Sequence, residues 1–393
     1  MQREILVGGV GMVPFVKPSA NLGYDQLGTE AVRLALKDAG IDYDDVDQAY
    51  AGYVYGDSCA GQRVLYAAGF TGVPIVNVNN NCSTGSTALY LARQAIEGGM
   101  AECVIAVGFE QMKPGAIGDT FTDRVSPFAA FDEACEALVD VELPLALRYF
   151  GGAGREHMER YGTTIADFAK VRAKASRHAA NNPLSVFRSV MTEEDVLAAP
   201  VLWPGVMTRP MACPPTCGAA AAVLMSRDFA RQKGLSPKVR IAAQAMVTDT
   251  PETFGSGSMI NLVGGEMTRK ASTQVYEEAG VGPEDLKLVE LHDCFAHNEV
   301  ITYEGLALCA IGGASGFIAD GDNTYGGRVV TNPSGGLLSK GHPLGATGLA
   351  QCYELTNQLR GTADSRQVEG ARHGLQHNLG LGGACVVTMY EGI

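Results

Sequence analysis

The chain has 393 residues, of which 46% are hydrophobic and 19% are charged. This composition is typical of an ordinary globular protein, and the length predicts two domains or a duplicated one. The formal net charge of −13 argues against a surface made for nucleic acid or for an anionic membrane. No apolar run in the sequence reaches the length needed to span a bilayer.

The ten cysteines are scattered without pairs at metal-ligand spacing, so we predict no metal site. Reduced thiols are the simplest expectation. The first residues lack the pattern of a signal peptide, and the last four, Tyr390–Ile393, carry no peroxisomal tripeptide. These features together predict a cytoplasmic protein.

The first part of the chain alternates between expected strands and helices. Strands are predicted over 4–11, 46–54, 73–78 and 103–108, and helices over 24–39 and 87–96. The helix at 24–39 ends at Gly40, a frequent helix stop. This alternation indicates an α/β fold with a largely internal sheet.

From about Met112 the chain becomes richer in charge, proline and glycine, with helical patterns at 165–180 and 192–198. A core strand is predicted again at 218–225. We therefore expect residues 112–211 to form an inserted loop domain that packs over the sheet.

The second half of the chain repeats the first. The helix, glycine stop and acidic turn of 31–46 recur at 271–286, and the strand at 218–225 is matched at 383–390. Cys82-x-x-Gly85-x-Thr87 is matched by His342-x-x-Gly345-x-Thr347. We predict a duplicated βαβ unit, with one half in 1–111 plus 212–235 and the other in 236–393. A pseudo-twofold axis would bring the helix starts after Cys82 and His342 together.

The stretch NNNCSTGSTAL at 79–89 lies between a predicted strand and a predicted helix. A cysteine in the first turn of a helix faces unpaired N–H groups and the positive end of the dipole, which stabilise a thiolate. Our hypothesis is that Cys82 attacks an acyl carbonyl. The alternative is a buried structural cysteine.

Three further stretches supply groups that such a nucleophile needs. Leu291-His-Asp-Cys-Phe295 follows a predicted strand, whose end would present side chains to a cleft. A glycine-rich loop at 334–348 contains His342 and leads into a helix. The small residues of 377–383 leave backbone N–H groups open to a ligand oxygen.

The motifs NNNCSTGSTAL, LHDCF, SKGHPLGATGLAQ and HNLGLGG resemble the thiolase superfamily, and within it the sterol-carrier-protein-type thiolases. The resemblance runs from about residue 5 to residue 390. It implies an α/β thiolase fold of two duplicated βαβαβαββ halves in a five-layered αβαβα arrangement, with an inserted loop domain.

The resemblance also implies a role for each motif. Cys82 matches the acyl-accepting nucleophile, and His342 would take its proton and polarise the thioester oxygen. His292 stands where most thiolases have an asparagine that helps hold an oxyanion-stabilising water. Cys294 would be the acid/base that serves the leaving enolate and the incoming nucleophile.

A second oxyanion hole would combine the backbone N–H of Cys82 with one from the loop of Gly380 and Gly382, and His377 is a further candidate for substrate binding. The segment 128–142 is unusually acidic for a domain expected to hold coenzyme A. We take the other cysteines as buried packing residues and three histidines as structural: Cys59, Cys103, Cys135, Cys213, Cys217, Cys309, Cys352 and Cys385, with His157, His178 and His373.

The activity implied by the resemblance is that of a 3-ketoacyl-CoA thiolase in fatty-acid β-oxidation, of the acetyl-CoA or propanoyl-CoA C-acyltransferase type. Coenzyme A would be a substrate, no cofactor would be needed, and the protein would form a homodimer or a dimer of dimers. One alternative is an acetoacetyl-CoA-forming thiolase, or another condensing enzyme, that works with a partner. Another is a lipid-transfer or acyl-CoA-binding protein without thiolysis, which the presence of Cys82, His342 and Cys294 together disfavours.

Overall fold

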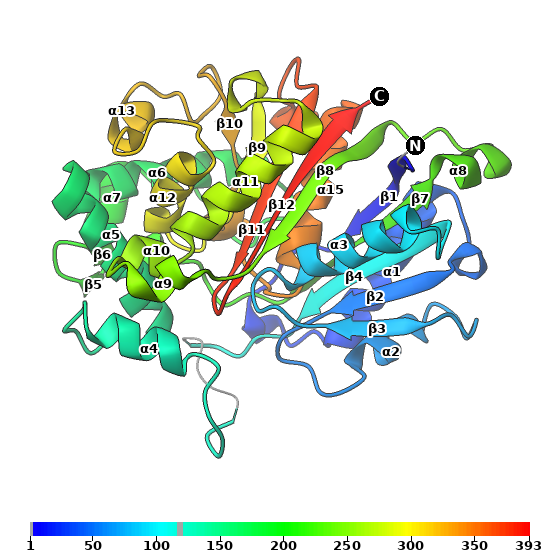
Figure 1. Cartoon of the computed structure of the whole chain (residues 1–393), viewed down its shortest axis with the longest axis horizontal. Helices are drawn as coiled ribbons and strands as arrows, with labels where there is room; N and C mark the ends of the chain where they lie inside the picture. The colour runs from blue at the N-terminus through cyan, green and yellow to red at the C-terminus, as the bar shows by residue number, and fades with distance from the viewer. Residues whose placement is uncertain (1–2, 116–120) are drawn as a thin grey trace.

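The computed structural model describes residues 3–115 and 121–393, and its centre is a ten-stranded sheet (Figure 1). The strands follow the order β3-β2-β4-β7-β1-β8-β12-β11-β9-β10. The first set is β1 (Ile5–Met12), β2 (Gln48–Gly52), β3 (Ile75–Val78), β4 (Cys103–Glu110) and β7 (Gly218–Ser226). The second set is β8 (Val239–Val247), β9 (Leu288–Glu290), β10 (Val330–Thr331), β11 (His373–Gly380) and β12 (Ala384–Gly392). The two sets meet where β1 pairs with β8.

Both sets have the same arrangement of strands. β2 is parallel to β3 and β4, and β7 is antiparallel to β4 and β1. In the same way β9 is parallel to β10 and β11, and β12 is antiparallel to β11 and β8. Each strand of the first set therefore has a counterpart at the same place in the second, and the predicted duplication is confirmed.

Helices cover the outside of both strand sets and fill the space between them. They are α1 (Tyr24–Ala39), α2 (Ala60–Leu65), α3 (Thr84–Glu97), α11 (Gly265–Ala279), α12 (Ala296–Gly305) and α15 (Thr347–Arg360). α1 and α2 pack on the outer face of the first set, and α11 and α12 on that of the second. α3 and α15 lie side by side in the middle (Figure 1). The result is the five-layered αβαβα arrangement of the thiolase fold.

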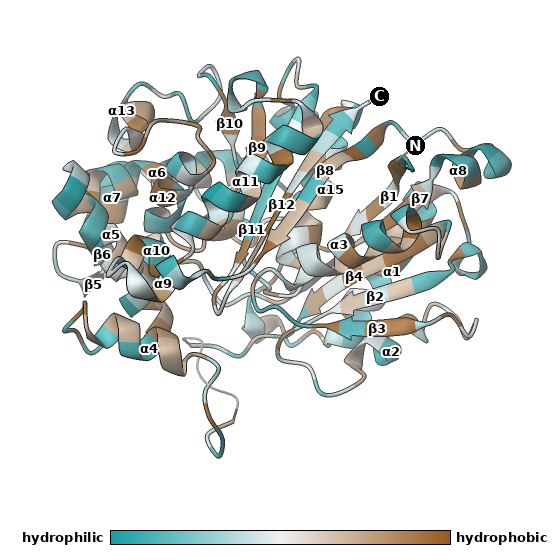
Figure 2. Cartoon of the chain, in the orientation of Figure 1, coloured by the Kyte–Doolittle hydropathy of each residue, from teal (hydrophilic) through white to brown (hydrophobic). Residues whose placement is uncertain are grey.

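The sequence explains where the helices begin and end. α1 has the predicted bounds, because its buried residues recur at helical spacing and Gly40 ends it with a φ of +69°. Figure 2 shows the strands largely hydrophobic and the ribbon of α11 largely hydrophilic, as expected for an outer helix beside a buried sheet.

Between β4 and β7 the chain leaves the sheet and forms a separate layer of four helices and two short strands. They are α4 (Ala129–Glu136), α5 (Leu145–Tyr161), α6 (Ile165–Ala180), α7 (Glu193–Leu197), β5 (Val201–Trp203) and β6 (Met207–Thr208). α5 and α6 pack against α12, and their apolar side chains join the core of the second half. The predicted helix at 165–180 is α6. The boundaries of the three domains, 1–111 plus 212–235, 112–211 and 236–393, stay a prediction.

Short helices complete the described part of the chain: α8 (Arg227–Lys233), α9 (Pro251–Gly255), α10 (Met259–Leu262), α13 (Ala314–Ala319) and α14 (Gly336–Ser339). The strand predicted at 46–54 is shorter than expected. After Gly52 the backbone N–H groups of Val54 and Tyr55 donate to the side chain of Glu110 instead of a strand. No helix among the described residues is both long and apolar enough to cross a membrane.

Candidate active site

The starts of α3 and α15 touch, and glycines allow this approach. A Cβ on Gly85 would lie 2.7 Å from the carbonyl oxygen of Gly345, and one on Gly348 would lie 2.4 Å from the backbone nitrogen of Ser86. Any larger residue would push the two helices apart. Because Cys82 and His342 precede these helices in the two halves, their turns meet, as the repeat predicts.

Three side chains converge at this crossing. The Sγ atom of Cys82 and one ring nitrogen each of His292 and His342 lie within 4.8 Å of one another. The two imidazole rings stand at 84° with their centroids 5.0 Å apart. All three residues are buried, and Cys82 retains 8% exposure. Residues predicted from three separate motifs thus form one cluster.

His342 is positioned by contacts at the start of α15. Its Nδ1 lies 2.7 Å from the Thr347 hydroxyl, and its backbone N–H donates to the Thr216 hydroxyl at 3.2 Å. Among the described residues Nε2 has no hydrogen-bond partner although it is buried. Burial, and secondly the charge of Lys340, lower the pKa of His342 to about 3. The ring is therefore neutral in the resting protein.

His292 is held by an amide that the sequence analysis missed. The side-chain Nδ2 of Asn378 lies 3.0 Å from His292 Nδ1 and 3.1 Å from the carbonyl oxygen of Cys82. Asn298 donates to the His292 carbonyl at 2.6 Å. Burial, together with the neighbouring His342, holds the pKa of His292 well below its usual value. Asn378 directly follows His377 in the HNLGLGG motif, which was the available signal.

Cys82 differs from the prediction in its protonation. α3 begins at Thr84, so Cys82 lies before the helix, packed against Met112 and Leu344. Burial raises the pKa of the Cys82 thiol to about 12, and the buried Glu110 adds to this effect. The backbone amides of Leu381 and of Cys82 itself act in the opposite direction and lower the pKa. Loss of hydration therefore outweighs the stabilisation of a thiolate that the helix start was expected to give.

Two more thiols belong to this region. Cys294 is buried, and burial raises the pKa of its thiol well above the usual value, with contributions from Cys213 and Cys82. Cys213 donates its backbone N–H to the carbonyl of Cys294 at 2.9 Å. Cys213 is partly exposed, as is Cys309, and Cys59 is exposed. These three cysteines were wrongly predicted to be buried.

The HNLGLGG loop contributes mainly through its backbone. A Cβ on Gly380 would meet the carbonyl oxygen of Asn80 at 2.2 Å, so glycine permits β11 to approach the Cys82 turn. Gly382 lines the large cavity described below. The imidazole of His377 is buried beside His292, and both of its nitrogens have protein partners: Nε2 bonds the Thr268 hydroxyl at 2.9 Å and Nδ1 accepts the backbone N–H of His292 at 3.4 Å.

A buried carboxylate joins two loops of the site. Glu110 accepts the backbone N–H groups of Val54 and Tyr55 at 3.0 Å each, and that of Gly345 at 3.1 Å. Burial raises its pKa to about 7. The sequence analysis missed Glu110, although a charged residue that directly continues the apolar run of β4 was a signal.

A cavity of about 790 Å³ opens beside the Cys82 turn. Its lining includes Asn81 and Leu381, next to the Cys82 sulfur, and apolar side chains such as Phe121, Val125 and Phe128. Arg124 also lines it, with its guanidinium paired to Asp123. This lining suits an apolar chain better than a set of phosphates.

Of the other histidines, His157 and His178 bond protein groups at both ring nitrogens, and His373 lies 3.9 Å from Glu391. These contacts agree with a structural role.

Comparison with known proteins identifies the family. Residues 6–192 match the thiolase N-terminal domain and residues 253–390 match the thiolase C-terminal domain-like family. The chain is 52% identical to sterol carrier protein 2 of Gallus gallus, over 99% of this chain and 72% of that protein. It is 41% identical to non-specific lipid-transfer protein-like 2 of Caenorhabditis elegans, over 99% of this chain and 96% of that protein. Human mitochondrial 3-ketoacyl-CoA thiolase has the same fold, with a TM-score of 0.74 at 19% identity over 100% of this chain and 99% of that one. The chain therefore belongs to the thiolase superfamily, in the branch of the sterol-carrier-protein-type thiolases.

Proposed function

We propose that the protein is a 3-ketoacyl-CoA thiolase, which cleaves its substrate with coenzyme A through an acyl-Cys82 intermediate. The observation that carries the proposal is the cluster of the Cys82 sulfur with one nitrogen each of His292 and His342 within 4.8 Å. The unpartnered Nε2 of His342 is available to accept the proton of a thiol that burial keeps protonated.

In the first step the Cys82 sulfur attacks the 3-keto carbon while its proton passes to His342. The oxyanion that forms is stabilised by the backbone N–H groups of Cys82 and Leu381, which already favour negative charge on the sulfur. The bond between the α and β carbons then breaks. The acyl group stays on sulfur, and the electron pair becomes the enolate of acetyl-CoA or propanoyl-CoA.

The enolate needs a hydrogen-bond donor and a proton. His292 and His342 face the thioester oxygen as donors, and Cys294 gives its proton to the α carbon. A thiol whose pKa is raised by burial stays protonated until a stronger base forms beside it. The resulting Cys294 thiolate takes the proton of coenzyme A, whose sulfur attacks the acyl-Cys82 carbonyl. Cys82 leaves as a thiolate and recovers its proton from His342.

Alternative activities use the same residues differently. In the reverse direction the groups form the carbon–carbon bond, as in an acetoacetyl-CoA-forming or other condensing enzyme that works with a partner. A lipid-transfer or acyl-CoA-binding protein would use only the apolar cavity. The name of the Caenorhabditis elegans relative, non-specific lipid-transfer protein-like 2, supports this alternative.

The test is the loss of 3-ketoacyl-CoA, followed by its enolate absorbance, with and without free coenzyme A. We expect coenzyme-A-dependent cleavage by the native protein, and a Cys82 acyl adduct visible by mass spectrometry. Cys82→Ala removes both, Cys294→Ala slows cleavage by about 10²–10⁴-fold, and Cys309→Ala, at a partly exposed thiol, leaves both intact. No cleavage at any acyl chain length would refute thiolysis.

We also propose that the protein forms a homodimer through the edge strand β3. β3 is the last strand of the sheet, with β2 as its neighbour among the described strands. No charged residue occurs between Arg63 and Arg93, so no charge blunts this edge against pairing with a second copy. Val76 on the strand is 46% exposed, and Phe70 before it is 84% exposed.

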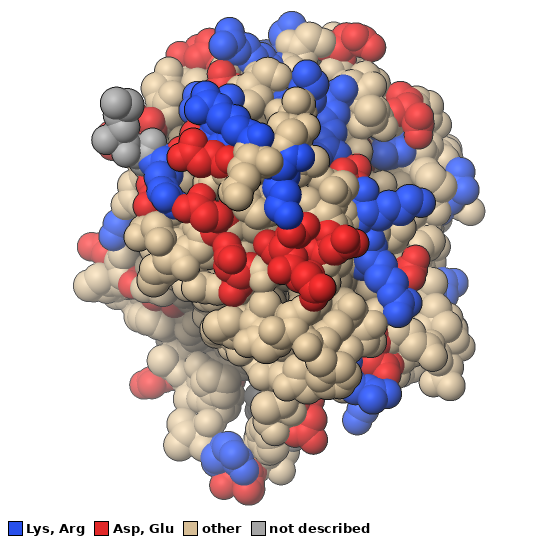
Figure 3. Space-filling view, turned by 90° about the vertical axis from the view of Figure 1, so that its right-hand side faces the viewer, with Lys and Arg blue, Asp and Glu red and all other residues tan. Residues whose placement is uncertain are grey.

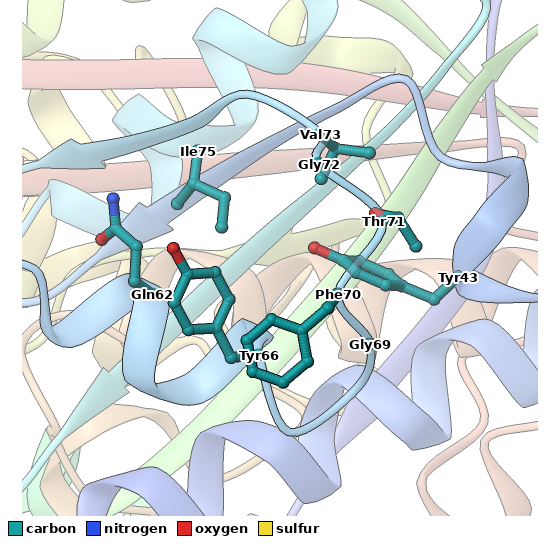
Figure 4. Close-up of a pocket in the computed structure, with 9 residues that line it drawn as sticks. All are labelled: Tyr43, Gln62, Tyr66, Gly69, Phe70, Thr71, Gly72, Val73 and Ile75. Carbon is teal, nitrogen blue, oxygen red and sulfur yellow. The ribbon is translucent and has the colours of Figure 1, made fainter.

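The surface beside β3 is also uncharged and carries exposed apolar side chains. In Figure 4, Tyr66 and Phe70 lie side by side at a pocket of about 460 Å³. Figure 3 shows the side of the molecule that lies on the right in Figure 1, where the loop before β3 is found. On this side, charged side chains lie above a broad uncharged area. Such an uncharged surface favours contact with another copy.

Light scattering tests the dimer. It should give a dimer for the native chain and a monomer for Val76→Lys, while Val190→Lys, at a residue 56% exposed in the insertion, stays dimeric. A native monomer contradicts this assignment.

A further inference from the structure

The two histidines of the site are held by different kinds of side chain, an amide on His292 and a hydroxyl on His342. We propose that Asn378 and Thr347 fix these neighbouring rings in opposite tautomers. The proton of His292 is on Nε2, and the proton of His342 is on Nδ1. The tautomers follow from the contacts alone, and only their use in catalysis rests on the proposed thiolysis.

The carbonyl oxygen of Cys82 fixes the orientation of the Asn378 amide. A carbonyl can only accept, so the group that faces it at 3.1 Å must be the NH₂ and not the side-chain oxygen. The second hydrogen of the same NH₂ points to His292 Nδ1 at 3.0 Å. Nδ1 must then carry a lone pair. A neutral imidazole has one N–H, so His292 is protonated at Nε2.

A buried hydrogen-bond chain gives the same orientation independently. Gln376 Nε2 lies 2.7 Å from the carbonyl of Gly348, which marks it as the donor end, and it also donates to the Ser86 hydroxyl at 2.7 Å. The Ser86 hydrogen is then free to reach Asn378 Oδ1 at 2.8 Å. Tyr390 donates to the other end of Gln376. The amide of Asn378 is therefore oriented from both sides.

The hydroxyl of Thr347 acts in the opposite sense on His342. Its oxygen lies 3.1 Å from the carbonyl of Pro343, one turn back, so its hydrogen is donated there. The same oxygen can then only accept from His342 Nδ1, at 2.7 Å. His342 is protonated at Nδ1 and presents a lone pair at Nε2, the atom that no described residue bonds.

Opposite tautomers divide the work of two chemically identical rings. His342 offers Nε2 as an acceptor for the Cys82 proton, whereas His292 offers Nε2–H as a donor to a developing oxyanion. Burial lowers the pKa of both rings, so both stay neutral and the distinction persists at ordinary pH. Asn378 and Thr347 act through the rings, which makes them positioning residues.

Nuclear magnetic resonance of histidine-labelled protein tests the proposal without any turnover, because ring ¹⁵N shifts distinguish the two tautomers. The signals are assigned with His292→Asn and His342→Asn. In the native protein we expect Nε2–H for His292 and Nδ1–H for His342. Identical tautomers in the two rings, or the reverse assignment, overturn the proposal even if the positioning variants described next fail to fold.

Variants separate positioning from simple packing. In Asn378→Asp the carboxylate can only accept, so His292 should become protonated at Nδ1. Thr347→Val should release His342 from its Nδ1–H form. The matched control is Thr87→Val: Thr87 makes the equivalent bond to the Ser83 carbonyl at 3.0 Å, but no described imidazole bonds its oxygen. Both histidine signals should be unchanged in this control, and unchanged signals in Asn378→Asp would overturn the role of the amide.

Activity supplies a separate readout. Asn378→Asp should lower kcat by about 10²–10³-fold, the cost of losing one oxyanion donor, with little change in KM. If kcat of Asn378→Asp falls by this factor while the tautomers of both histidines stay unchanged, the mechanism is contradicted. If the native protein shows the expected tautomers but no thiolysis, the proposed function fails while the tautomer assignment stands.

Discussion

Replacing Glu110 with Gln tests how burial controls a carboxylate at the site. The pKa of Glu110 rises from 4.5 to about 7 because it is buried, although three backbone N–H groups oppose this rise. Below pH 4.5 the carboxyl is protonated in the folded and unfolded chains alike. Above pH 7 it is ionised in both, and the folded state bears the cost of a buried charge. The shift corresponds to about 3 kcal/mol of stability, present at low pH and lost as the pH rises from 4.5 to 7.

Glutamine does not titrate, so the native protein should lose about 3 kcal/mol relative to Glu110→Gln across this interval. The variant also turns an NH₂ toward one backbone N–H, which costs about 1–3 kcal/mol at every pH. The test is therefore how the stability difference between the two proteins changes with pH, and not its size at any one pH. The assay is chemical denaturation of both proteins at one concentration and several pH values.

Glu369→Gln, at an exposed carboxylate, is the matched control and should show no such slope. If the stability difference between the native protein and Glu110→Gln is the same at pH 4.5 and pH 8, the reasoning from burial is wrong.

Three other predictions follow from contacts of the described residues. Gly85→Ala places a Cβ 2.7 Å from the Gly345 carbonyl and should cost about 1–3 kcal/mol, measured as a lower Tm; an unchanged Tm contradicts the close approach. Lys174→Met leaves the buried Glu299 without its cation and should cost about 3–5 kcal/mol in chemical denaturation, whereas Lys170→Met at a half-exposed side chain should cost little. Zinc ions should inhibit thiolysis by binding the thiol and the two imidazoles that lie within 4.8 Å, and a chelator should restore it; equally tight zinc binding by the native protein and by Cys82→Ala would contradict this reading.

The sequence was sufficient where periodicity and repetition carry the information. The bounds of α1 and α6 were predicted because apolar residues recur at helical spacing between clear end signals. The meeting of Cys82 with His342 was predicted because both precede equivalent helices of a duplicated unit.

What the sequence could not show was the surroundings of these groups. Asn378 lies almost three hundred positions after Cys82, and neither its neighbours nor its spacing reveals which way its amide points. The effect of burial on the pKa of Cys82 could not be predicted, because hydration is lost through residues such as Met112 and Leu344 that lie close only in the folded chain. A helix start can be read from sequence, but the depth at which it is buried cannot.

The crossing of α3 and α15 also bears on how such a site can arise. If two identical half-length chains paired about a true twofold axis, the residue before each helix would be the same on both sides. Such a pair offers two thiols or two imidazoles, never one of each. Joining the halves in one chain removes this constraint, so one copy can become the nucleophile and the other the base. The asymmetry between Cys82 and His342, with Thr87 and Thr347 still making the same bond behind them, is a division of labour that two identical half-length chains could not hold.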